Sequence, residues 1–119
     1  MNTFPVTRIF SDEHGDSHFD DIAIPMESAG EIGFLSTLHP ASGIIFREVV
    51  PEYDYDFHNA PARQYLILLD GQIEIETSLG DVRTFRAGEV LLLEDVTGKG
   101  HRTRNLIQEK RRSIFIPLP

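Results

Sequence analysis

The chain has 119 residues, of which 40% are hydrophobic and 25% charged, a composition typical of one globular domain. It contains no cysteine, which excludes a disulfide scaffold, a cysteine-ligated zinc site and a thiol nucleophile. Eleven basic residues against nineteen acidic ones give a net charge of −8, which disfavours nucleic acid and anionic membranes as partners. No apolar run approaches the length that a membrane span needs, which is about 18 residues. Residues 1–10 lack the pattern of a secretion signal. We therefore expect a cytoplasmic protein.

The first 43 residues carry the weakest strand pattern. Residues 4–10 predict a strand, whereas the polar and acidic residues 11–21 predict a loop. Residues 19–24 and 33–38 predict short strands or irregular cover. We expect residues 1–43 to form an arm that covers a barrel made by residues 44–119, within one structural domain.

The middle of the chain predicts a series of short strands. Residues 44–50 and 53–57 are separated by Pro51, and residues 65–69 form a continuous apolar run. Asp70-Gly71 follows that run and predicts a hairpin, because both positions of such a turn favour a positive φ. Residues 72–76 then alternate strictly between apolar and polar side chains, which places Ile73 and Ile75 on the buried face of a strand.

The last third continues this pattern. Turns at residues 79–81 and 87–89 bound short strands at 82–85 and 90–93, and residues 101–107 and 113–116 close the chain as strands. No window shows the apolar periodicity of a helix. Short strands joined by closely spaced turns predict an all-β sandwich or barrel.

Charge is distributed unevenly along the chain. Eighteen of the nineteen acidic residues precede residue 99, whereas six of the eleven basic residues lie between Lys99 and Arg112. This distribution predicts ion pairs between the last strands and earlier ones. The alternative is a cationic rim that attracts an anionic small molecule.

The strand at residues 53–57 has two contrasting faces. Regular alternation places Tyr53, Tyr55 and Phe57 on one face and Asp54, Asp56 and His58 on the other. Three aromatic side chains in a stripe need cover, from a second sheet, the amino-terminal arm or a partner subunit. The alternation also places Asp56 near any pocket that contains His58.

Residues 58–105 resemble the two conserved motifs of the cupin superfamily. In the first motif, His58 takes the place of the first histidine and Gly71 that of the closing glycine, while Ala60 and Gln64 stand where the second histidine and the glutamate are expected. In the second motif, the matching residues are Gly98, His101 and Asn105. The resemblance implies a cupin double-stranded β-helix (jelly roll) and a homodimer. It leaves the activity open, because this fold carries many functions.

The resemblance also implies a metal site with an altered ligand set. Most catalytic cupins hold a divalent transition metal with three histidines and one glutamate; here His58, His101 and the neutral amide of Gln64 take those positions. The alternative is a site without any cofactor, in which His58 and Gln64 form a hydrogen-bonded polar cluster.

Without a metal, His58 and His101 are candidate acid–base groups, since imidazole titrates near neutral pH. Glu94 is a third catalytic candidate; it follows an apolar strand and either enters the pocket mouth or caps a turn.

The substrate-binding candidates are the polar residues expected to share the face of the two histidines, with one arginine in an apolar strand. They are Gln64, Asn105, Thr103, Asp56 and Arg47. Arg47 either pairs outward with an acid or binds a substrate carboxylate.

These residues support two hypotheses. The first is an enzyme that acts on a small polar metabolite bearing a carbonyl or carboxylate, by histidine-based proton transfer or with a weakly held metal. The alternative is a non-catalytic cupin that binds or senses a small molecule in the same pocket.

Overall fold

The computed structural model describes residues 2–119, which form eleven strands and one short 3-10 turn, with no α-helix. The elements are β1 (Asn2–Ser11), β2 (Ser17–Ser28), η1 (Gly30–Ile32), β3 (Phe34–Leu35), β4 (Ile45–Val49), β5 (Asp54–His58), β6 (Gln64–Leu68), β7 (Gln72–Thr77), β8 (Val82–Arg86), β9 (Val90–Leu93), β10 (His101–Asn105) and β11 (Arg111–Pro117). Within residues 2–119, no helix is long and apolar enough to cross a lipid bilayer.

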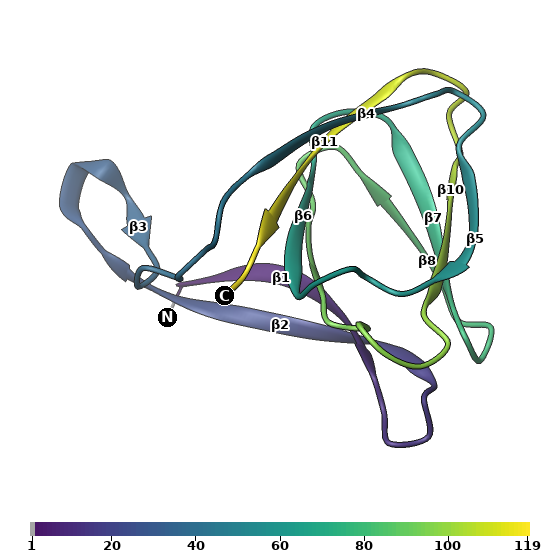
Figure 1. Cartoon of the computed structure of the whole chain (residues 1–119). Helices are drawn as coiled ribbons and strands as arrows, with labels where there is room; N and C mark the ends of the chain where they lie inside the picture. The colour runs from purple at the N-terminus through teal and green to yellow at the C-terminus, as the bar shows by residue number, and fades with distance from the viewer. Residues whose placement is uncertain (1) are drawn as a thin grey trace.

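The strands form two sheets that enclose one interior. The larger sheet has the order β3-β2-β1-β9-β6-β11-β4, and the smaller has the order β5-β10-β7-β8. In Figure 1, β4, β6 and β11 form one wall of the barrel and β5, β7 and β10 the opposite wall. The prediction of an all-β jelly roll is confirmed.

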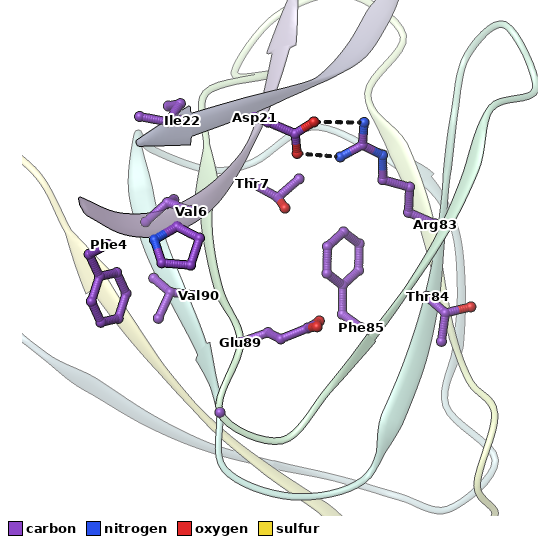
Figure 2. Close-up of a pocket in the computed structure, with 12 residues that line it drawn as sticks. Phe4, Val6, Thr7, Asp21, Ile22, Arg83, Thr84, Phe85, Glu89 and Val90 are labelled. Carbon is purple, nitrogen blue, oxygen red and sulfur yellow. Dashed lines mark hydrogen bonds and ion pairs between the residues drawn. The ribbon is translucent and has the colours of Figure 1, made fainter. Parts of the chain in front are cut away.

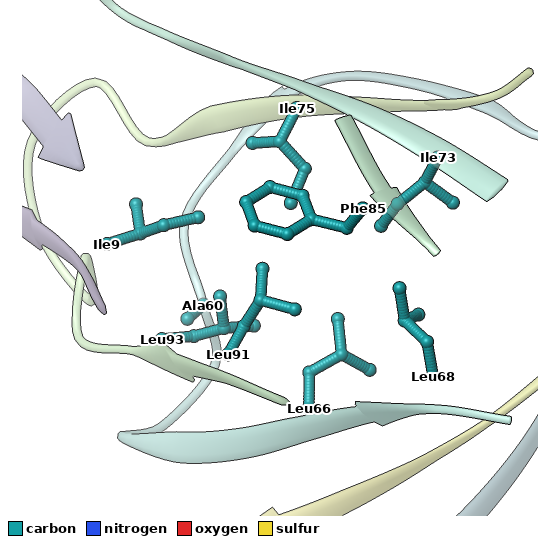
Figure 3. Packing of buried hydrophobic residues seen from close by; sticks show 9 residues of the cluster. All are labelled: Ile9, Ala60, Leu66, Leu68, Ile73, Ile75, Phe85, Leu91 and Leu93. Atoms are coloured by element: carbon teal, nitrogen blue, oxygen red, sulfur yellow. The ribbon is translucent and has the colours of Figure 1, made fainter. Parts of the chain in front are cut away.

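The core lies between the two sheets. Nine buried apolar residues pack together there, contributed by both sheets and by the loop after β5: Ile9, Ala60, Leu66, Leu68, Ile73, Ile75, Phe85, Leu91 and Leu93 (Figure 3). The predicted inward positions of Ile73 and Ile75 are confirmed, and both side chains are fully buried. The period of two fixes these positions because only one face of β7 is covered by the second sheet.

The amino-terminal segment is more regular than its sequence predicts. The loop expected at residues 11–21 is wrong after residue 16, since β2 begins at Ser17 and pairs along its length with β1. The acidic side chains are exposed, and Asp20 pairs with Arg8 and Asp21 with Arg83, so their polarity is compatible with a strand. β1 also pairs in parallel with β9, which joins this hairpin to the larger sheet. In Figure 1 the β1–β2 pair runs along the barrel and β3 extends beyond it.

The hairpin predicted at Asp70-Gly71 is wrong. β6 and β7 belong to different sheets, so this connection carries the chain from one sheet to the other. Gly71 has a φ of 72°, but no non-glycine residue between 2 and 119 has a positive φ, and Asp70 therefore lacks the conformation that a two-residue hairpin requires. Both edges of β6 are already occupied, by β9 and β11. The turn predicted at residues 79–81, in contrast, does join the antiparallel pair β7–β8.

The predicted cross-strand ion pairs are present. Arg104 of β10 contacts Glu74 of β7 at 3.0 Å, and Arg112 of β11 contacts Glu48 of β4 at 3.2 Å. Each pair joins neighbouring antiparallel strands on an outward face. Exposed pairs of this kind contribute little stability individually, but they neutralise most of the basic cluster near the end of the chain.

Candidate active site

A cavity of about 430 Å3 opens between the two sheets and contains both histidines singled out above. A volume of this size is within the range of small-molecule sites. Its wall comes from β4, β5, β6, β9, β10, β11 and the loop after β5, and it mixes aromatic, aliphatic and polar side chains. The polar and aromatic lining residues are Arg47, Tyr53, Tyr55, His58, Asn59, Gln64, His101, Thr103 and Phe115.

The first residue of β10 carries the most buried polar group of the wall. The His101 ring is 4% exposed, and its Nδ1–H donates to Oδ2 of Asp95 at 2.5 Å. The Asp95 side chain is fully buried, and its Oδ1 has no hydrogen-bond partner among residues 2–119. Because a carboxylate only accepts, Nδ1 of His101 carries the hydrogen and the neutral ring keeps its lone pair on Nε2.

His58 lies beside His101, with ring centroids 4.7 Å apart. Its Nδ1–H donates to the backbone carbonyl of Asp56 at 2.8 Å, which again leaves the lone pair on Nε2. Burial lowers the pKa of His58 below its usual value of 6.5, and the neighbouring His101 and Arg47 act in the same direction. At neutral pH, His58 is therefore a neutral base within reach of a second imidazole.

A β-bulge decides which face of β5 meets the cavity. His58 pairs with His101, whereas Tyr55 pairs with Thr103, so three steps along β5 oppose two along β10. The prediction that Tyr55 and His58 lie on opposite faces is therefore wrong: their ring centroids are 4.0 Å apart with the planes tilted by 44°, and Tyr53 and Tyr55 line the cavity. The extra residue breaks the alternation on which that prediction depended.

The loop between β9 and β10 is fixed against the segment after β5. The backbone N–H of Ala60 donates to the Asp95 carbonyl at 3.2 Å, and the Asn59 side chain donates to the carbonyl of Gly98 at 3.0 Å. The loop also contacts the β1–β2 turn, since Lys99 N–H donates to the Gly15 carbonyl at 2.9 Å. These bonds hold the Asp95 carboxylate beside Nδ1 of His101.

Three of the predicted binding residues line the cavity. Gln64 and Thr103 are buried, and both lie on its wall. Arg47 lies there too; its Nε–H donates to Ser113 Oγ at 3.0 Å, and its guanidinium lies 4.4 Å from the Phe115 ring centroid. The interpretation that Arg47 pairs outward with an acid is therefore wrong, because its side chain turns inward from β4.

The other three predicted residues lie outside the lining. Glu94 is held between Arg8 and Arg63 on the outer side of the barrel, so its expected place in the pocket mouth is wrong. Asp56 is exposed and meets His58 only through its backbone carbonyl, as a consequence of the bulge. Asn105 turns away, donating to the Val50 and Pro51 carbonyls and accepting from Arg111 Nε–H at 2.9 Å.

The donors present do not match the metal site that the fold family implies. Within residues 2–119 no group of three or more histidine, cysteine, aspartate or glutamate side chains is arranged to hold a metal ion. His58 and His101 offer two imidazoles, and Gln64 offers only a neutral amide oxygen. The buried carboxylate nearest to them, Asp95, is engaged by Nδ1 of His101. No catalytic step is therefore derived through a metal.

Either Glu94 or Asp95 could be expected from the sequence to enter the pocket mouth, but only Glu94 was predicted to be catalytic, whereas the structure places Asp95 in the site. The two residues follow β9 directly, and alternation sends one carboxylate outward to the arginines and the other inward. The signal available was the inward direction of Leu91 and Leu93, which share a face with residue 95 if the strand direction continues.

A second cleft, of about 470 Å3, lies between the β1–β2 hairpin and β8. Figure 2 shows Phe85 at its centre and the ion pair of Asp21 with Arg83 along one side. Two of its three charged groups, Asp21 and Arg83, are thus already paired with one another, and its lining contains no histidine. The cavity with His58 and His101 is the better candidate for chemistry.

No protein-family model matches the chain, and no curated protein matches it. Several solved structures are similar in fold, among them the following two. The Schizosaccharomyces pombe Cnp3 cupin domain superposes with a TM-score of 0.52 at 10% identity, covering 100% of this chain and 86% of that one. Drosophila melanogaster CENP-C, solved bound to CAL1, gives a TM-score of 0.50 at 15% identity, covering 70% of this chain and 64% of that one. At these identities the likeness concerns the fold alone.

Proposed function

We propose that this chain, which has the fold of a cupin domain, is an enzyme that moves a proton on a small carbonyl- or carboxylate-bearing molecule held in the barrel cavity. The observation that carries the proposal is the buried hydrogen bond between Nδ1 of His101 and Asp95. An unshared carboxylate behind an imidazole orients the ring and stabilises the imidazolium that forms when Nε2 accepts a proton.

In the proposed reaction, Nε2 of His101 removes a proton from a carbon next to a carbonyl. The C–H bond breaks and its electron pair forms a carbon–carbon double bond, while the carbonyl π pair moves onto oxygen to give an enolate. The proton then resides on His101 beside the Asp95 carboxylate. Gln64 and Thr103 are two of the donors on the wall that could serve the enolate oxygen. Return of the proton to another carbon, or to the same one, completes an isomerisation or an exchange.

His58 is the second acid–base group. Its ring centroid lies 4.7 Å from that of His101, and burial lowers the pKa of His58, which favours its neutral form at neutral pH. Two facing imidazoles avoid being charged together, so one accepts a proton while the other remains a base.

The test is hydrogen–deuterium exchange at the carbon next to the carbonyl, followed by 1H NMR in D2O with a set of small 2-oxo acids and ketones. We expect exchange with the unmodified protein and a loss of about 10²-fold or more in His101→Gln. His39→Gln is the matched control, since His39 contacts Tyr65 outside the cavity.

Exchange that persists in His101→Gln would overturn the proposal. Saturable binding of a member of the set with no exchange in any of them would instead favour the non-catalytic alternative, a cupin that binds or senses a small molecule. A ligand that binds without exchange and whose affinity changes in His58→Gln would place that ligand in this cavity.

A further inference from the structure

The inner face of β4 and β11 carries two arginines that have no acidic partner. Seven basic residues form ion pairs with carboxylates: Arg8, Arg63, Arg83, Lys99, Arg102, Arg104 and Arg112. Of the other four, Arg86 and Lys110 are exposed to solvent, whereas Arg47 lines the cavity and Arg111 is buried next to it, outside the lining. Neither of these two has an ion pair with any carboxylate among residues 2–119.

Arg111 is the most unusual side chain of the interior. It is 1% exposed, and its two terminal nitrogens, Nη1 and Nη2, have no hydrogen-bond partner among the described residues. Its only side-chain hydrogen bond runs from Nε to Asn105, and its guanidinium lies 5.4 Å from the Tyr53 ring centroid. Burial and the neighbouring Arg47 lower the pKa of Arg111 to about 10, so the group remains charged at neutral pH.

Arg47 occupies the adjacent place on the same face. Ser113 pairs with Arg47, and Arg111 with Val49, so the two arginines are diagonal neighbours on antiparallel strands. The Arg47 guanidinium lies 5.6 Å from the Tyr53 ring, which both arginines therefore share, and Arg47 lines the cavity with His58 and His101.

Two like charges placed together in a barrel cost stability unless an anion compensates them, because burial of an unpaired charge is strongly unfavourable. From this placement we propose that Arg47 binds the carboxylate of a small organic acid inside the cavity, and that Arg111, buried next to Arg47 and outside the lining, adds a second positive charge that favours the anion. A planar guanidinium matches a carboxylate in a bidentate arrangement, and the aromatic wall excludes water from the pair. The inference rests on the proposed function, whose substrate class it narrows: the carboxylate lies at the β4–β11 end and the reacting carbon at the histidine end.

The test uses malonate as the probe and malonamide, which has the same shape without charge, as its control. The thermal midpoint of the full chain is measured against the concentration of each at constant ionic strength, to obtain an apparent Kd. We expect a saturable rise of the midpoint with malonate and none with malonamide. In Arg47→Met and Arg111→Met the apparent Kd for malonate should rise about tenfold or more.

Arg112→Gln is the matched control, because Arg112 is the next residue on β11 but pairs outward with Glu48. It should leave the apparent Kd within about twofold of the original. Without malonate, Arg111→Met should fold with an unchanged or higher midpoint, since it removes an uncompensated buried charge and keeps the stem. If Arg111→Met fails to fold, Arg47→Lys, which keeps the charge and loses the planar fork, still tests the site by the same rise in apparent Kd.

Absence of saturable malonate binding, equal shifts with malonamide, or an equal loss in Arg112→Gln would overturn this inference. The outcome that would overturn the proposed function is different from these. His101→Gln should keep malonate binding while losing proton exchange, so exchange that survives in His101→Gln leaves the carboxylate site standing. Exchange without arginine-dependent malonate binding removes the carboxylate site alone.

Discussion

Gly100 lies directly against the backbone of His58: a Cβ atom at Gly100 would come within 2.0 Å of the His58 carbonyl oxygen. Gly100 also has a φ of +74°, a conformation that other residues adopt at a cost. This close approach brings the start of β10 to the end of β5. It therefore places the two imidazoles side by side on one wall of the cavity.

Gly100→Ala should consequently destabilise the protein more than a positive φ alone explains. Gly80→Ala is the matched control, since Gly80 has a φ of +93° with open space around its Cβ position. Strain of the backbone costs about 1–3 kcal/mol at such positions, and the clash at Gly100 adds to it. Urea unfolding measures both variants; equal losses in the free energy of unfolding would contradict the close approach.

Asp95→Asn should preserve the fold and impair proton exchange. The amide no longer stabilises the imidazolium, and its NH2 group favours the tautomer of His101 with the hydrogen on Nε2. We expect a loss of about 10²-fold or more in exchange rate, together with a change in the 15N shifts of the His101 ring. Glu94→Gln is the control, because Glu94 contacts only the outer arginines in this region. A larger loss of exchange rate in Glu94→Gln than in Asp95→Asn would contradict this prediction, because the carboxylate that supports exchange would then be Glu94.

The stability of the protein should decrease as the pH is lowered below about 6.5, in part because of His58. Burial lowers the pKa of His58, so the unfolded chain binds a proton more readily than the folded one. The contribution is present above the unfolded value of 6.5 and is lost as the pH falls toward the lower folded value. The charged and titratable groups facing the ring are His101, Asp95 and Arg47.

The measurement is the difference in free energy of unfolding between the original protein and His58→Gln across pH 7 to 5. The difference should shift in favour of His58→Gln as the pH falls. A difference that is constant with pH would show that the ring titrates alike in both states.

Gln64→Glu should increase the affinity for a divalent transition metal. The unmodified wall presents two imidazoles and a neutral amide, whereas the variant adds a carboxylate to them. Metal content after incubation with nickel or zinc, measured by inductively coupled plasma mass spectrometry, should be substoichiometric in the original and higher in Gln64→Glu. His101→Ala in the same background should abolish the gain. Near-stoichiometric metal in the original, lost in His101→Ala, would show that the existing donors suffice.

Local patterns predicted those parts of the fold that depend on neighbouring residues. The alternation around Ile73 and Ile75 predicted their burial, and the motif spacing predicted that His58 and His101 lie together. The partner of each strand was not predictable in this way. Asp70-Gly71 has the composition of a hairpin, yet β6 pairs with β9 and β11, which follow much later in the chain.

The site depended on strand register as well as on residue type. Nothing local in the run Lys110-Arg111-Arg112 marks Arg111 as the buried member; its pairing with Val49 of β4 turns it inward. Likewise, the sequence of β5 contains no signal for an extra residue opposite β10. A sequence pattern describes regular strands, whereas a bulge arises from the pairing of two of them.

The bulge in β5 also governs the sign of the cavity's charge. Regular pairing would have turned Asp54 and Asp56 inward; the bulge turns Tyr53 and Tyr55 inward and leaves both acids outside. A chain with a net charge of −8 therefore encloses a wall on which Arg47 is the charged residue at neutral pH. An anionic molecule must cross a repulsive outer field before it meets the attractive interior, so added salt, by screening that field, should speed its entry.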